Sequence, residues 1–210
     1  NLITFGGERA AGEAAERINK LHRVINGVDE VTGEWYDALD YEQLLWVHAA
    51  LEVSTIAFFE LTVEPLSAPE KDRYHEENKT AAELLMLPRD FVPATFADTT
   101  RYVDDMTTCG RLRVTDVSRE VADLITTSAV PARIKPLWKF VAFAAVGTLP
   151  PAVRDLYGFG WTPPKQRLLD ANFALMRMAV PRLPWRVRTI VPARWADLRL
   201  ANPLPEAPGA

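Results

Sequence analysis

Residues 41–61, YEQLLWVHAALEVSTIAFFEL, form the segment that most constrains the fold of this chain. Apolar residues recur at helical spacing on most sides of the segment, and Asp40 stands directly before it, where a helix N-cap belongs. A helix that is apolar on most sides has to be covered by other elements. The segment therefore predicts a helix that runs through the core of a helical domain.

The rest of the chain also follows a helical pattern. Ser67 and Glu70 match a capping box, which predicts that a polar surface helix begins there and ends before Pro88. Further helices are predicted over residues 14–25, 95–109, 116–127, 137–149 and 164–179. Residues 28–39 lack a helical period and carry a Thr-Gly turn, so they predict a loop or a short hairpin. The pattern predicts an all-α fold with one domain over residues 1–210.

The two ends of the chain give expectations of their own. Beyond Pro181, further prolines at positions 184, 192, 203, 205 and 208 predict an extended C-terminal segment that wraps the domain. Residues 203–210 are expected to be a disordered tail. The chain begins at Asn1 and not at a methionine, so we expect that an N-terminal segment of the domain is missing.

Composition excludes several classes of protein. A net charge of −4 argues against a general nucleic-acid binder, and a single cysteine, Cys109, excludes a disulfide framework or a multi-cysteine metal site. No stretch approaches the ~20 uninterrupted apolar residues of a membrane span. The single cysteine suits a reducing compartment, and we expect a cytoplasmic protein. Arginines and tryptophans intermix over residues 182–199, which leaves open a peripheral contact with a membrane surface.

Most standard catalytic motifs are absent from the sequence. It contains no P-loop, no dinucleotide-binding glycine pattern, no nucleophile elbow and no His-Glu-x-x-His. Asp72 and His75 form the nearest match to the Glu-x-x-His pattern of di-iron bundles, but they fall in the most polar helix. The pattern therefore predicts a solvated surface for this pair.

The two remaining histidines are the candidate functional residues. His22 lies at the edge of the apolar stripe of its helix, and His48 lies inside the long apolar helix. A buried neutral imidazole needs a partner for each ring nitrogen. A hydrogen bond within the core and a ligand or catalytic role both meet that need. Long apolar helices, six tryptophans and abundant arginine are also compatible with a haem slot.

Several segments, taken in order, resemble one family of oxygenases. The matching segments are HRVING (22–27), WYDALDYEQLLWVHAALEVS (35–54), the region 74–77, LMLPRDFVP (85–93), GTLPPAVRDLYGFGW (147–161) and PARWADLRLANP (192–203). Together they resemble the DUF2236 family of latex-clearing (rubber) oxygenases and fungal MpaB-like oxygenases. The resemblance covers nearly all 210 residues.

The resemblance implies an all-α, globin-reminiscent core and, as in the rubber oxygenases, haem b. It implies that His22 is the axial iron ligand. His48 belongs to a matching block and is the candidate catalytic residue, with a hydrogen bond inside the core and a place in the cofactor pocket both open. Arg154 is a candidate for binding a haem propionate, or equally for clamping a helix end.

The chain also departs from the family pattern. The rubber oxygenases carry an arginine and a threonine upstream of the ligand histidine, and this sequence contains no matching positions. Apart from this departure, the resemblance predicts a haem b-dependent oxygenase that acts on an apolar, isoprenoid or lipid-like substrate, with dioxygen as the second substrate. The alternative is a non-enzymatic all-α protein that binds an apolar ligand without haem. An excess of arginine over lysine indicates a GC-rich bacterial source.

Overall fold

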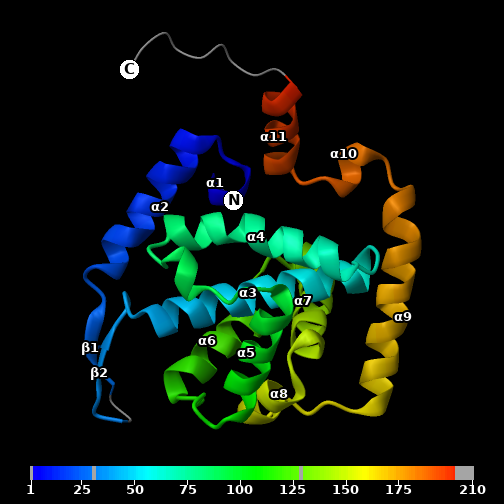
Figure 1. The fold of residues 1–210 in the computed structure, drawn as a ribbon. Coiled ribbons are helices and arrows are strands. Elements are labelled where there is room, and N and C mark those ends of the chain that lie inside the picture. Colours follow the sequence, from blue (N-terminus) through cyan, green and yellow to red (C-terminus); the bar gives the residue numbers. More distant parts are fainter. Residues whose placement is uncertain (1, 30–31, 128–129, 202–210) are drawn as a thin grey trace.

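The structure is a computed structural model that describes residues 2–29, 32–127 and 130–201. Its longer helices are α2 (Glu8–His22), α3 (Tyr41–Thr62), α4 (Ala68–Leu84), α5 (Phe96–Thr108), α6 (Asp116–Thr127), α7 (Lys135–Thr148), α9 (Pro163–Ala179) and α11 (Val191–Ala201). Shorter elements are α1 (Leu2–Phe5), α8 (Pro151–Tyr157), α10 (Trp185–Arg188), three 3-10 turns and the strands β1 (Asn26–Val28) and β2 (Trp35–Asp37). Figure 1 shows that helices dominate, and the predicted all-α class is confirmed.

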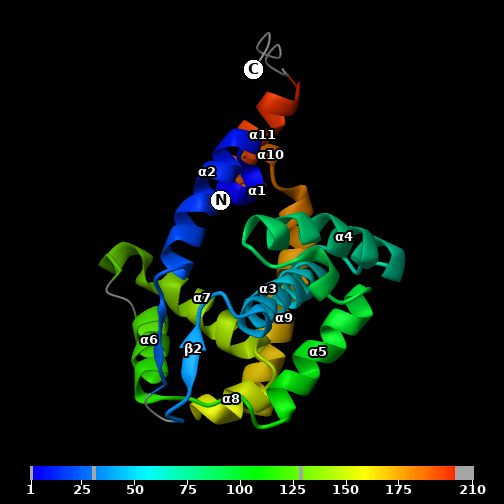
Figure 2. The same ribbon diagram turned by 60° about the vertical axis from the view of Figure 1, so that its left-hand side comes forward.

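Helix α3 occupies the centre of the molecule, as predicted. The Asp40 side chain accepts a hydrogen bond from the backbone N–H of Glu42 at 2.8 Å and so begins the helix. Figure 1 shows α3 running beneath α4, and in Figure 2 helices α5 and α7 lie on either side of it. Helices α4, α5 and α9 all contact it. The apolar residues of α3 thus pack in two separate hydrophobic cores.

The first core joins α3 to α4 and α5. Helix α4 begins with the predicted capping box, in which the Glu70 carboxylate accepts a hydrogen bond from the Ser67 backbone N–H at 2.8 Å. The buried side chains of this core are Leu45, Ala49, Ala82, Leu87, Val92 and Val103. They hold α4 against α3 over the part of α3 that carries His48.

The second core joins α3 to α7 and α9. Its buried residues are Ala144, Leu169 and Phe173, and the Phe173 ring meets Phe58 of α3 edge-on with centroids 6.1 Å apart. A Cβ atom at Gly147 would lie 2.5 Å from a side-chain atom of Leu169, so α7 and α9 approach this closely only because position 147 is a glycine.

Helix α2 ends earlier than predicted. The apolar period continues to Ile25, but the helix stops at His22 because the next residues enter a β-hairpin. Strands β1 and β2 pair antiparallel, with Asn26 opposite Asp37. The hairpin predicted within residues 28–39 is thus confirmed, and it begins two residues before that range. His22 consequently lies at the very end of its helix, next to the hairpin.

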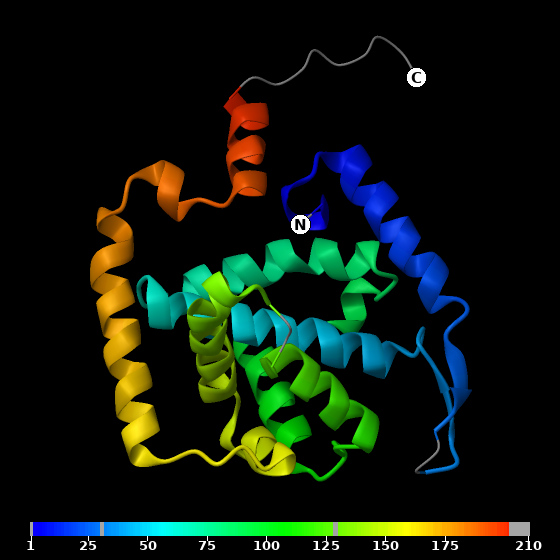
Figure 3. The ribbon, with the colours of Figure 1, turned by 180° about the vertical axis from the view of Figure 1, so that it is seen from behind.

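The predicted extended C-terminal segment is wrong, because the described part of it is helical. Pro184 is the N-cap of α10 and Pro192 is the second residue of α11, positions where a missing backbone N–H removes no helix hydrogen bond. Figure 3 shows α11 returning to the N-terminal end beside α1, where the Arg199 guanidinium donates to the Phe5 carbonyl. The predicted disorder of residues 203–210 lies outside the described residues.

One helix in the described ranges, α3, is long and apolar enough to cross a membrane by length and composition alone. The segments Ala132–Thr148 and Pro151–Tyr157 reach the same threshold only together, and they are bent by 117° at the break between them. A core helix can have this same length and composition, and α3 packs against helices of both cores.

Candidate functional site

A cavity of about 460 Å³ lies between the end of α2 and the facing sides of α3 and α4. Its apolar lining includes Leu44, Val47, Leu51, Ala82, Leu85 and Leu87. Its polar lining includes His22, His48, Glu52, Tyr74 and Asn78. The structure thus brings both candidate histidines to one cavity, whose size and mainly apolar lining are typical of a small-molecule site.

His22 reaches this cavity from the last turn of α2. Asn19, one turn earlier, donates a hydrogen bond from its side-chain amide to the Leu84 carbonyl at 2.9 Å, which ties the end of α2 to the end of α4. The Nδ1 atom of His22 is buried and has no hydrogen-bond partner among the described residues. A buried polar atom left in this state points to an interaction that the folded chain does not itself provide.

His48 lies on the side of α3 that faces the cavity. Its side chain is 11% exposed, and its Nε2 atom is buried without a partner in the described ranges. Burial lowers the pKa of His48, and the nearby His75 ring lowers the pKa further. The imidazole is therefore neutral at pH 7. Its Nε2 atom can donate or accept one hydrogen bond, depending on the tautomer.

Glu52 and His75 form a buried pair behind His48. The Glu52 side chain is fully buried and the His75 side chain is 1% exposed. His75 Nδ1 lies 2.9 Å from Glu52 Oε1, and His75 Nε2 lies 2.9 Å from the Pro93 carbonyl oxygen. Burial raises the pKa of Glu52, while His75 and the neighbouring Asn78 act in the opposite direction. The other carboxyl oxygen, Oε2, is 3.8 Å from His48 Nε2.

The prediction of a solvated surface at His75 is wrong. Helix α4 is polar overall, but His75, Lys79 and Ala82 recur at helical spacing and form its buried side. Asp72 does not join His75, because its carboxylate accepts the Phe96 backbone N–H at 3.0 Å. In the described part of the chain no group of three His, Cys, Asp or Glu side chains is placed to hold a metal ion.

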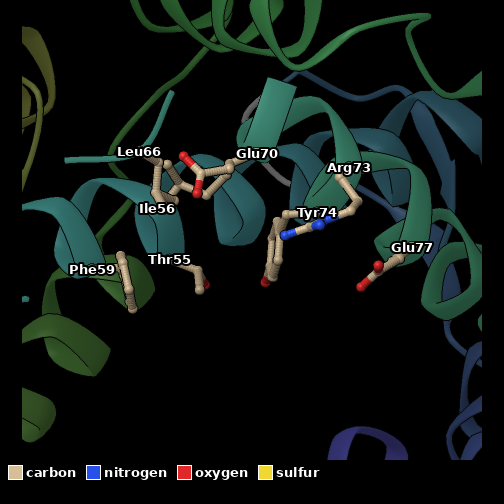
Figure 4. Close-up of a pocket in the computed structure, with 8 residues that line it drawn as sticks. All are labelled: Thr55, Ile56, Phe59, Leu66, Glu70, Arg73, Tyr74 and Glu77. Atoms are coloured by element: carbon tan, nitrogen blue, oxygen red, sulfur yellow. The ribbon is translucent and has the colours of Figure 1, made fainter. Parts of the chain in front are cut away.

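A second cavity, of about 310 Å³, adjoins the first. Thr55 of α3 and Tyr74 of α4 line both cavities. Figure 4 shows the two side chains pointing into the same open space, with Phe59 and Ile56 on one side and charged residues of α4 on the other. The two cavities therefore adjoin at these two residues, and the second also carries the charged side chains Glu70, Arg73 and Glu77.

The family model described as "ER-bound oxygenase mpaB/B'/Rubber oxygenase, catalytic domain" matches residues 2–180. The chain belongs to this family. No curated protein and no solved structure matches it. The matched range of the oxygenase domain contains every residue that lines the two cavities and ends before α10 and α11.

Arg154 of this oxygenase domain lies away from the histidines. It is not among the described residues that line the 460 Å³ cavity. Its guanidinium donates to the carbonyls of Gly147 and Leu149 at 2.8 and 2.9 Å and lies over the Trp161 ring at 5.2 Å. These contacts clamp the end of α7, which is one of the two predicted roles. A contact with a haem propionate stays a prediction.

Sequence reasoning missed Glu52 and His75 as members of the site. A signal for Glu52 does exist, because it is the only Asp, Glu, Lys or Arg among residues 44–59 and it follows His48 by one helical turn. A single carboxyl group in an apolar helix indicates a buried acid. His75 has no comparable signal, since its neighbours in sequence are polar and its burial depends on how α4 packs against α3.

Proposed function

We propose that this oxygenase domain binds haem b through His22 and oxidises an apolar substrate of isoprenoid or lipid-like character. The observation that carries the proposal is the buried Nδ1 atom of His22, which lacks a partner in the described ranges and belongs to a ring that lines the cavity. Of the five buried side-chain atoms without a partner in the described ranges, three belong to residues that line this one cavity. The family match supports oxygenase chemistry in general terms.

The donor set fits a haem better than an iron held by the protein alone. Non-haem iron in oxygenases takes three side-chain ligands, and no such group exists among the described residues. A haem takes a single axial histidine together with an apolar slot. His22 offers the imidazole, and Leu44, Val47 and Leu51 offer apolar surface.

The haem, when bound, supplies the iron at which dioxygen is activated. The chain itself supplies the other requirements. His22 would hold the haem at the end of a helix that a hydrogen bond from Asn19 ties to α4. In the adjoining second cavity, Ile56, Phe59 and Leu66 offer the apolar surface that an apolar substrate requires. His48, as the candidate catalytic residue, holds or releases a proton at Nε2.

The test is a titration of the purified chain with haem, followed by its Soret absorption. We expect stoichiometric binding in the wild type and a loss or shift of the Soret band in His22→Ala. His48→Ala serves as the matched control, since it removes the other imidazole of the cavity and should leave the axial ligand in place. A Soret band that is identical in the wild type and His22→Ala would remove His22 from this role.

The second candidate function is that of a non-enzymatic carrier of an apolar ligand. It is favoured by the mainly apolar lining of the cavity and by the lack of positions matching the arginine and threonine of the rubber oxygenases. It predicts that haem does not bind stoichiometrically. It also predicts that His22→Ala binds an apolar ligand as tightly as the wild type does.

We further propose a cytoplasmic location with a peripheral membrane contact through residues 182–199. The support is the exposure of Trp185 and Trp195, at 44% and 61%, in a segment rich in arginine. Sedimentation with anionic liposomes tests this contact. Binding that is unchanged in a variant with both tryptophans replaced by alanine would contradict it.

A further inference from the structure

The Glu52–His75 pair holds one proton between its two side chains. Pro93 presents only a carbonyl oxygen to His75 Nε2, so Nε2 carries a hydrogen and donates it. The other ring nitrogen, Nδ1, lies 2.9 Å from Glu52 Oε1, and two atoms that only accept cannot face each other at that distance. One proton therefore lies between Nδ1 and Oε1, and the pair has no net charge.

The remaining carboxyl oxygen, Glu52 Oε2, is an acceptor in either arrangement of that proton. It is a carbonyl oxygen if Oε1 holds the proton and a carboxylate oxygen if Nδ1 holds it. Oε2 and His48 Nε2 are both buried without a hydrogen-bond partner in the described residues. They lie 3.8 Å apart, too far for a hydrogen bond but close enough for one oxygen atom to reach both.

We propose that Glu52 Oε2 and His48 Nε2 form a subsite for a hydroxyl group, and that the substrate of this domain is an apolar alcohol. The inference rests on the proposed function, because it names the substrate class of the same cavity. A hydroxyl group donates its hydrogen to Oε2 and accepts the hydrogen of the Nε2–H tautomer of His48. Both buried atoms then gain the partner that they lack.

Other ligand groups satisfy this pair less well. A hydrocarbon leaves both atoms unpaired, and an ether oxygen only accepts, so Oε2 stays unpaired. A carboxylate would bring a second set of acceptors against Oε2. An ammonium ion would bring a charge to a pair that is neutral overall, inside a mainly apolar lining. The hydroxyl group alone among these is neutral and both donates and accepts.

The second cavity offers apolar surface for the remainder of such a molecule. Beyond the shared residues Thr55 and Tyr74, the second cavity adds Ile56, Phe59 and Leu66 (Figure 4). An unbranched or isoprenoid chain that begins at the hydroxyl subsite and continues past Thr55 and Tyr74 would contact this second apolar surface.

The experiment compares geraniol with its methyl ether and with the matching hydrocarbon, 2,6-dimethylocta-2,6-diene. Each displaces Nile red from the full chain, and fluorescence gives the affinities. We expect geraniol to bind about tenfold more tightly than either analogue, because the analogues leave a buried polar atom unpaired. Simple partition into an apolar cavity gives the opposite order, since the hydrocarbon is the most hydrophobic probe. Equal affinities, or tighter binding of the hydrocarbon, would overturn the proposal.

Three variants test whether His48 and Glu52 cause the preference for the alcohol over the hydrocarbon. His48→Leu and Glu52→Met should each bring the ratio of alcohol to hydrocarbon affinity close to one. Glu52→Gln should keep the ratio, because its amide can donate to His75 Nδ1 while its carbonyl replaces Oε2. Leu51→Ala is the matched control and should weaken all three probes by a similar factor. If Glu52→Met does not fold by circular dichroism, His48→Leu decides, and a ratio unchanged in His48→Leu refutes the subsite.

Failure of the haem proposal and failure of the subsite are distinguishable. The affinities are measured on the chain with and without added haem, beside the Soret band of the same samples. An alcohol preference in a chain that takes up no haem rejects the haem and keeps the subsite. A haem complex without any alcohol preference rejects the subsite and keeps the haem.

Discussion

The α7–α9 core and the cavity between α2, α3 and α4 differ in how their buried polar groups are paired. Around α7 and α9, the Arg154 guanidinium and the Trp161 indole N–H both have partners, the latter at 2.7 Å from the Gln166 amide oxygen. Between α2, α3 and α4, atoms of His22, His48 and Glu52 are buried without one in the described residues. The α7–α9 core uses its polar groups to hold helices together, whereas the cavity leaves atoms of three polar side chains without a partner among the described residues.

This contrast has a thermodynamic consequence. A buried polar atom without a partner lowers stability by about 1–3 kcal/mol, so the cavity region carries a penalty that a bound ligand would remove, as would replacement of that atom by an apolar group. Substitutions in the α7–α9 core should therefore reduce stability and leave ligand binding unchanged. Substitution of a cavity histidine should weaken ligand binding and change stability little.

The largest expected effect is that of Phe173→Ala. Phe173 is 2% exposed and packs edge-on against Phe58, so its truncation should lower the free energy of unfolding by about 3–5 kcal/mol. Urea denaturation followed by circular dichroism measures the change. Leu175→Ala, on an exposed side of the same helix, should change stability by less than about 0.5 kcal/mol. Similar losses in both variants would mean that α9 has no buried side.

Arg154→Met comes next. Removal of the guanidinium leaves the carbonyls of Gly147 and Leu149 without their donor and should cost about 1–3 kcal/mol. Thermal unfolding and haem titration are measured on the same samples, with Arg177→Met of α9 as the control. We expect lower stability with unchanged haem affinity. Unchanged stability with weaker haem binding would instead support the predicted contact with a propionate.

His48→Leu should affect stability little. Leucine fills the space of the ring without a buried nitrogen that lacks a partner, so we expect a change within about 1 kcal/mol, in either direction. The same unfolding experiment measures it. A loss of several kcal/mol would show that His48 is a structural residue and would remove the contrast between the two regions.

The smallest effect concerns Glu76, an exposed residue of α4 that is paired with Lys79 and Arg89. Hydrogen bonds from Lys79 and Arg89 lower the pKa of Glu76 to about 2. Because this value lies below the 4.5 of an unperturbed glutamate, this pairing stabilises the fold above about pH 4.5, and that stability is lost as the pH falls toward 2. Unfolding measured from pH 6 down to pH 2.5 should show a shallower slope in Glu76→Gln. Identical slopes would contradict the assignment.

Much of the fold follows from local signals in the sequence. The N-caps at Asp40 and Ser67 fix where α3 and α4 begin, and the apolar character of residues 41–61 identifies the central helix. Helices α10 and α11 are not predicted, because the repeated prolines beyond Pro181 are typical of an extended chain. Pro184 and Pro192 lie at helix starts, where proline is compatible with a helix.

The site was predictable only in part. His22 and His48 stand out because a histidine beside apolar residues is unusual, and the structure places both at one cavity. Their relation to Glu52 and His75 depends on packing between α3 and α4, which no local pattern encodes. In the sequence, Arg154 is one of several arginines that could bind an anion. Only the structure shows that its guanidinium donates its hydrogen bonds to backbone carbonyls.

The most direct measurement is rescue of a cavity variant by free imidazole. In His22→Gly, the side chain proposed as the iron ligand is replaced by open space. We predict that this variant fails to form the wild-type Soret-absorbing complex with haem and that added imidazole restores it. A variant that gives the wild-type spectrum without imidazole would contradict the assignment of His22 as the axial ligand.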